Sequence, residues 1–83
     1  MTGNKPEQVF RIGTVSASVF VNPREAGDEN RRETRSVAIQ RRYLDRKANE
    51  WKTADTFWLA DLPALREVID LALKYIAAKE ASA

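Results

Sequence analysis

The hydrophobic pattern changes its period once along the chain, and this change limits the folds that the sequence can adopt. Up to Leu59, apolar and polar residues mostly alternate with a period of two, which is typical of strands with one buried face. From Leu62 onward, apolar residues lie three and four positions apart, which is typical of an amphipathic helix. This order predicts an α+β fold: a three- to four-stranded antiparallel β-meander followed by one long C-terminal helix packed on one sheet face.

The first strand segment, residues 9–21, reverses its apolar parity at Gly13. Before this glycine, Phe10 and Ile12 are even-numbered, whereas after it Val15, Ala17, Val19 and Val21 are odd-numbered. A bulge or a sharp bend at Gly13 would bring both sets to one face of the sheet. The segment is therefore one kinked strand or two strands.

Two more strand segments follow a polar loop at residues 22–33. Residues 34–45 (TRSVAIQRRYLD) alternate, residues 45–50 (DRKANE) form a polar turn, and residues 51–59 (WKTADTFWL) alternate again. Strand, short turn and strand predict an antiparallel hairpin. We expect a flexible N-terminal tail over residues 1–8 and a single ββββα domain over residues 9–80.

The predicted helix has more apolar surface than one small sheet needs. Asp61 suits the N-cap position, and Pro63 is tolerated in the first turn. The apolar stripe comprises Leu62, Leu65, Ile69, Ala72 and Ile76, and it is widened by Val68, Leu71, Leu73 and Tyr75. A chain of 83 residues also builds only a marginal core. We therefore expect a homodimer with an interface that includes Leu65, Val68, Leu71, Ala72 and Tyr75.

The composition excludes several kinds of chemistry. The chain contains neither His nor Cys, so it lacks disulfides, zinc–thiolate sites and the usual proton shuttle at neutral pH. Its three Gly residues form no phosphate-binding loop. We expect no enzymatic activity, no cofactor, no metal site and no small-molecule substrate. Because no apolar run approaches the ~18 residues of a membrane span, we expect a cytoplasmic protein without membrane contact, with association with the nucleoid as an option.

Positive charge is concentrated between residues 31 and 47. Seven basic and two acidic residues give this segment a net charge of +5, and six of the seven are Arg, whose planar guanidinium suits phosphates and bases. If the helix covers one sheet face, the opposite face carries Ser16, Ser18, Phe20, Gln40, Arg42, Lys52, Thr56 and Trp58. Cations and exposed rings on a sheet predict binding of single-stranded DNA or RNA.

The predicted nucleic-acid site divides into cations for phosphates and rings for bases. The cations are Arg41, Arg42, Arg46, Lys47 and Lys52, and the rings are Phe20, Tyr43 and Trp58. Arg41 and Arg42 have opposite parity on their strand, so only one of them faces the ligand, and we favour Arg42.

Other interpretations of these residues stay open. Phe20 and Trp58 would also suit burial in a dimer interface or under the loop, and the Arg residues would also suit a solvated face with ion pairs. The alternative function is a protein-interaction module, in which the free sheet face or an edge strand docks another polypeptide.

Several short motifs together point to a known family. They are Gly13 with Val15-Ser16 in the first strand, Arg41 and Arg42 with Tyr43 and Asp45 in the second, and Leu59 before the helix. Over residues 10–76, the chain resembles the positive-cofactor-four type of single-stranded-DNA-binding transcriptional coactivator. It is also similar to small uncharacterised bacterial proteins with a W-K-x-x-x-x-F motif.

The resemblance implies a four-stranded antiparallel sheet, one C-terminal helix and a homodimer built through the helices. It also implies binding of melted or single-stranded DNA with little sequence preference, in a transcription or replication accessory role. The chain departs from the family in its long loop at residues 22–33, and WKTADTF replaces the family's K-P-G-(R/K)-K-G turn. Trp51 and Lys52 are then the nearest candidates for the contacts of that turn.

Overall fold

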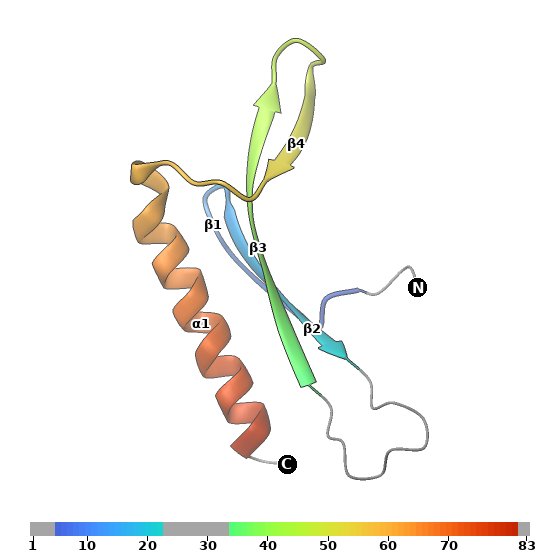
Figure 1. Ribbon diagram of the computed structural model, residues 1–83, viewed down its shortest axis with the longest axis vertical. Coiled ribbons are helices and arrows are strands. Elements are labelled where there is room, and N and C mark those ends of the chain that lie inside the picture. The colour runs from blue at the N-terminus through green and yellow to red at the C-terminus, as the bar shows by residue number, and fades with distance from the viewer. Residues whose placement is uncertain (1–4, 23–33, 82–83) are drawn as a thin grey trace.

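The computed structural model describes residues 5–22 and 34–81, and its elements follow the predicted order (Figure 1). Four strands, β1 (Gln8–Ile12), β2 (Val15–Asn22), β3 (Thr34–Asp45) and β4 (Glu50–Ala54), form one antiparallel sheet in the order β1-β2-β3-β4. A short 3-10 helix, η1 (Leu59–Asp61), leads into α1 (Leu62–Ala81), which packs against the sheet. The predicted α+β fold is confirmed.

A tight turn at Gly13 divides the first strand segment into β1 and β2. Gly13 has a φ of +61°, and it holds the first of the two turn positions between the paired residues Ile12 and Val15. A positive φ at that position alone is the pattern of a type II′ hairpin turn, for which Gly is preferred. Phe10 pairs with Ala17, so the two apolar sets share one face, as the parity predicts.

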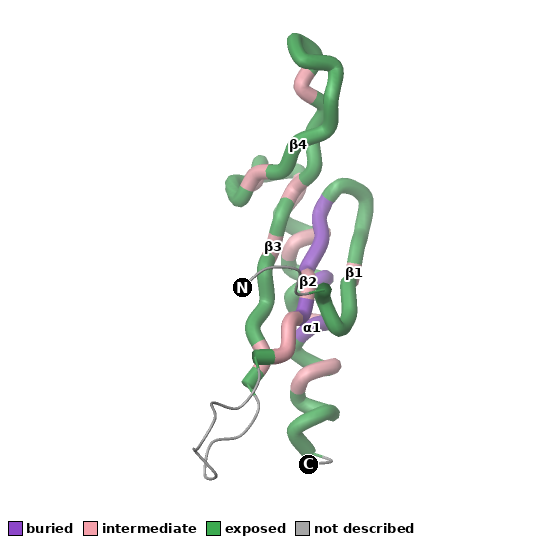
Figure 2. The backbone as a smooth tube through the Cα atoms, turned by 90° about the vertical axis from the view of Figure 1, so that its right-hand side faces the viewer, coloured by how far each residue is buried: buried purple, intermediate pink, exposed green. Residues whose placement is uncertain are grey.

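The core lies between β2 and α1. Val15, Ala17 and Val19 on β2 and Val68 and Ala72 on α1 are buried, and Figure 2 shows this burial concentrated on β2 and the middle of the helix. Half-buried apolar residues surround this layer: Phe10, Ile39, Phe57, Ala64, Leu65, Tyr75 and Ile76. A core with so few fully buried side chains is small, as the chain length predicts.

The burial of α1 side chains bears on the predicted dimer interface, which stays a prediction. Val68 and Ala72 are 0% and 2% exposed within the single chain, and Leu65 and Tyr75 pack against the same core. Val68 and Ala72 are therefore buried against the protein's own sheet, and Leu65 and Tyr75 are half-buried against it, whereas Leu71 is 36% exposed. The apolar side chains most exposed around the start and outer side of α1 are instead Leu59, Leu62, Ile69 and Leu73.

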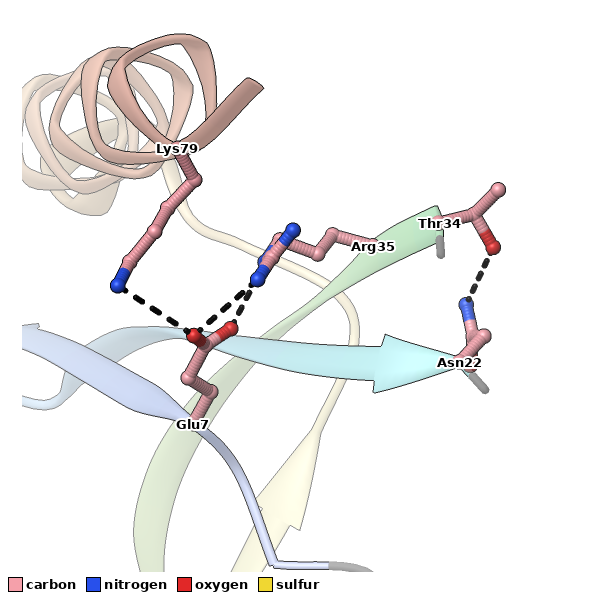
Figure 3. Close-up of polar contacts among 5 residues, drawn as sticks. All are labelled: Glu7, Asn22, Thr34, Arg35 and Lys79. Atoms are coloured by element: carbon pink, nitrogen blue, oxygen red, sulfur yellow. Dashed lines mark hydrogen bonds and ion pairs between the residues drawn. The ribbon is translucent and has the colours of Figure 1, made fainter. Parts of the chain in front are cut away.

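A polar cluster, here called the Glu7 cluster, joins three elements at the opposite end of the helix from η1 (Figure 3). The Arg35 guanidinium donates to both Glu7 carboxylate oxygens, from Nε at 2.8 Å and Nη2 at 3.3 Å, and Lys79 Nζ lies 3.9 Å from Oε2. The hydrogen bond from Arg35 lowers the pKa of Glu7, and burial together with the hydrogen bond to Glu7 raises the pKa of Tyr75. The cluster ties the start of β1 and the start of β3 to the last turns of α1.

The Glu7 cluster also bears on the predicted tail. The Glu7 amide donates to the Val19 carbonyl at 2.7 Å, and β1 begins at Gln8. The last two residues of the expected tail are therefore held against β2, while residues 1–4 lie outside the described residues.

Candidate nucleic-acid interface

β3 is long enough to pair with different strands along its two halves. Its first part, from Thr34 to Arg41, pairs with β2, and its last part, from Arg41 to Asp45, pairs with β4. Because α1 packs against β1, β2 and the adjoining part of β3, the β3–β4 hairpin extends beyond the helix-covered sheet (Figure 1). Five basic and two acidic residues fall within residues 41–54, so this hairpin is cationic.

The pairing register of the hairpin places Trp51, and not Lys52, on the side of Arg42. Arg42 pairs with Thr53 and Leu44 with Trp51, whereas Lys52 pairs with Tyr43 on the opposite side. Directly paired residues share a sheet face. The expectation that Lys52 and Arg42 share a face was therefore wrong, and Trp51 takes that place.

Arg42 and Trp51 form a contact on the side of the sheet away from α1. The Arg42 guanidinium carbon lies 4.7 Å from the Trp51 ring centroid, within the range of a cation–π interaction. Both residues are exposed, and Trp51 keeps 57% of its surface accessible. We call this pair, together with Leu44 and Thr53, the outer face of the hairpin. Arg11 on β1 is exposed and pairs with Ser16 of β2. It therefore extends this face toward the β1 edge of the sheet.

Arg41 points to the other side of β3 and holds the connection between β4 and α1. Its Nε donates to the Thr56 carbonyl at 2.8 Å, and it lies 3.8 Å from an Asp61 carboxylate oxygen. The same guanidinium lies 5.5 Å from the Tyr43 ring centroid and 5.8 Å from that of Trp58. Only 14% of the Arg41 side chain is exposed, so its first role is structural. We call Arg41, Tyr43 and Trp58 the inner face of the hairpin.

Trp58 lies outside any strand, which corrects the predicted strand over residues 51–59. β4 ends at Ala54, and Trp58 immediately precedes η1. Its amide donates to the Asp61 carboxylate at 3.1 Å, and the Asp61 amide donates back to the Trp58 carbonyl at 2.9 Å. The tryptophan backbone is therefore fixed while 70% of the residue surface remains exposed.

The tip of the hairpin is organised by Asp45. Its carboxylate accepts from the amides of Lys47 and Ala48 at 3.0 and 3.3 Å and pairs with Lys52 Nζ at 2.8 Å. The hydrogen bond from Lys52, followed by those from the two amides, lowers the pKa of Asp45. The charge of Lys52 is thereby balanced within the hairpin. Arg46 and Lys47 are exposed and have no ion-pair partner in the part of the chain that the structure describes.

The structure does not bring all the predicted contacts together. Phe20 lies on the same side of the sheet as Arg42, but it pairs with Ser36 near the far end of β3. Ser36 and Arg42 are six residue steps apart along the extended strand, which is a distance of about 20 Å. Phe20 is also half-buried. Arg31 and Arg32, from the basic segment, lie outside the described residues.

No protein-family model matches the chain, and no curated protein or solved structure shows significant similarity to it. The candidate interface is therefore defined by its own geometry. Within residues 5–22 and 34–81, no helix has the length and apolarity needed to cross a membrane.

Proposed function

We propose that this protein binds single-stranded nucleic acid on the outer face of the β3–β4 hairpin, with little sequence preference. The contact between the Arg42 guanidinium and the exposed Trp51 ring supports this proposal most strongly. An unpaired base stacks on an exposed aromatic ring, while neighbouring cations neutralise the phosphates on either side. Such a protein would serve as an accessory factor in transcription or replication.

Three cations on the hairpin are available to neutralise phosphates of a bound strand. Arg42, Arg46 and Lys47 are exposed and have no ion-pair partner among the described residues, whereas Lys52 is paired with Asp45. Three neutralised phosphates on a single strand correspond to a slope of about −2 for the logarithm of affinity against the logarithm of salt concentration. Affinity should then fall roughly 20-fold between about 50 mM and about 200 mM salt.

Titration of a fluorescent single-stranded oligonucleotide of about 15 nucleotides, monitored by anisotropy, tests this proposal. Trp51→Ala should weaken binding by roughly 5- to 150-fold, which corresponds to the stacking free energy of one base. Arg42→Glu should weaken binding and make the salt slope shallower by about 0.7. Lys74→Glu is the matched control, because Lys74 is exposed on α1 away from the hairpin. Absence of binding at low salt, or equal effects of R42E and K74E, would refute the proposal.

We also propose that two copies of the chain pair through the outer side of α1. A groove there is lined by Leu59, Leu62, Ile69 and Leu73 together with the charged residues Arg66, Glu67 and Asp70. Exposed apolar surface of this kind favours a protein contact over a nucleic-acid contact.

Two of the charges that line this groove, Arg66 and Asp70, favour a second copy as its occupant. In an antiparallel arrangement about a twofold axis near residue 68, Leu62 of one helix faces Leu73 of the other, and Arg66 faces Asp70. Arg66 has no ion-pair partner among the described residues, so the second copy would supply one. Asp70, which pairs with Lys74 in its own helix, would then also meet Arg66 of the second copy on both sides of the twofold axis.

A further inference from the structure

Arg41 and Arg42 are adjacent on β3 at the base of the hairpin. Their side chains point to opposite sides of the sheet, and each contacts a different tryptophan. Arg42 contacts Trp51 at 4.7 Å on the outer face, and Arg41 contacts Trp58 at 5.8 Å on the inner face. Both arginines precede the hairpin tip by only a few residues on β3. The hairpin thus presents an arginine-supported aromatic ring on each of its two sides at the same level.

Both rings are open to solvent. Trp51 and Trp58 are 57% and 70% exposed, and Tyr43 on the inner face is 37% exposed. Trp58 is additionally held through its backbone by Asp61 and through its ring by Arg41. A large exposed ring whose backbone is held by hydrogen bonds loses less conformational freedom when a partner binds than one on an unrestrained chain.

One nucleic-acid strand cannot stack on both rings at once, because a β-sheet and its side chains stand between them. With strands about 5 Å apart and side chains projecting from both faces, the hairpin forms a wall between the inner and outer faces. Two single-stranded segments that approach from opposite sides would satisfy both rings. The two strands of a duplex diverge in this way at a fork, where paired nucleic acid opens into two single strands.

We infer that the β3–β4 hairpin acts as a wedge at the junction between duplex and single-stranded nucleic acid, with one strand stacked on Trp51 and the other on Trp58. This inference rests on the proposed binding of single strands to the outer face. Arg46 and Lys47 at the leading tip attract the phosphates of the paired region. Ring–base stacking on each side replaces the base–base stacking that is lost at the opened pair.

The test compares three DNA substrates: a single strand, a duplex with one single-stranded arm, and a fork with two arms. 2-Aminopurine placed at the first base pair of the fork reports opening of that pair through an increase in fluorescence. The unmodified protein should bind the fork more tightly than either other substrate and should increase the 2-aminopurine signal.

Trp58→Ala should remove the preference for the fork: the ratio of fork affinity to single-strand affinity should fall by roughly 5- to 150-fold, to about one. Trp58→Phe retains a ring and should retain most of the preference, which separates loss of stacking from disturbance of η1. Trp51→Ala should weaken binding to all three substrates.

Each outcome addresses one proposal. Equal affinity for fork and single strand, or full fork preference in W58A, overturns the wedge and leaves single-strand binding standing. Absence of single-strand binding by the unmodified protein overturns the proposed function itself.

Discussion

At the scale of single residues, Gly13 is the position where backbone conformation constrains the sequence most directly. Its φ of +61° disfavours residues that have a Cβ atom, although a Cβ built there would meet nothing within 4 Å. The cost of substitution therefore arises from the backbone alone and not from steric contact with neighbours.

Gly13→Ala should lower the free energy of unfolding by about 1 to 2 kcal/mol, as measured by urea denaturation. Thr14→Ala is the matched control, because Thr14 is exposed in the same turn without a positive φ, and its effect should stay within about 0.5 kcal/mol. Equal stability of the two variants would contradict the role assigned to Gly13.

Sequence periodicity predicts the orientation of Arg41 and Arg42 correctly but misplaces Trp58. The alternation of residues in β2 and β3 correctly separates Arg41 from Arg42, because side-chain direction in a strand has a period of two. The same reasoning placed Trp58 on a strand that ends at Ala54. Asp55 and Thr56 are compatible with continued alternation, and the hydrogen bonds between Trp58 and Asp61 that terminate the extended chain are visible only in three dimensions.

At the scale of elements, the register of the β3–β4 hairpin decides which side chains share a face. Asp45 pairs with Glu50, which leaves four residues in the loop. A loop one residue shorter or longer would put Lys52 on the side of Arg42. The polar segment DRKANE predicts a turn but not its length, which is set by the Asp45 hydrogen bonds and by Asn49 at a φ of 55°.

The order of strands and helix was predictable because each element has its own hydrophobic period. The sequence did not predict which side of α1 covers the sheet, because apolar residues occupy most of the circumference of this helix. Val68 and Ala72 are buried and Ile69 is 43% exposed, yet all three are apolar. Packing against β1 and β2 selects the buried face, and periodicity alone leaves the choice open.

The Glu7 cluster predicts how the joining of β1, β3 and α1 depends on pH. Because the pKa of Glu7 in the folded protein is below its ordinary value of 4.5, the cluster stabilises the fold above that pH. This stabilisation is lost as the pH falls through the lowered pKa, when the carboxylate takes up a proton.

Glu7→Gln should therefore lower the melting temperature at about pH 7 and reduce its further decrease between about pH 5 and about pH 3. Thermal unfolding followed by circular dichroism measures both effects. Asp45, whose pKa is also lowered, is present in both proteins and does not affect their difference. Glu80→Gln, an exposed change on α1 next to Lys79, should follow the unmodified protein. A parallel pH dependence in E7Q and the unmodified protein would exclude this role for the cluster.

At the scale of the whole molecule, the sheet leaves one side of α1 without a partner. Ile69 lies in the exposed groove, whereas Leu71 lies on the other flank of the helix with similar exposure, 43% against 36%. The proposed pairing therefore depends on Ile69 and not on Leu71.

Sedimentation equilibrium should show a dimer for the unmodified protein, a monomer for Ile69→Asp and a dimer for Leu71→Asp. Both substitutions place the same carboxylate on α1, so only the position differs. A monomeric unmodified protein, or dissociation by L71D in place of I69D, would contradict the proposed interface.

The division of β3 between two partners has a consequence for how the molecule opens. Among the described residues, Arg41 is the one β3 residue paired on both sides, with Val15 and with Ala54. The buried core lies between β2 and α1, so the segment from Arg42 to Ala54 contributes little to it. The hairpin can therefore fray as a separate cooperative unit while the rest of the fold stays closed. Apart from the Arg42 amide, which donates to the Thr14 carbonyl at 2.9 Å, its amide hydrogens should exchange with solvent well before those of β2.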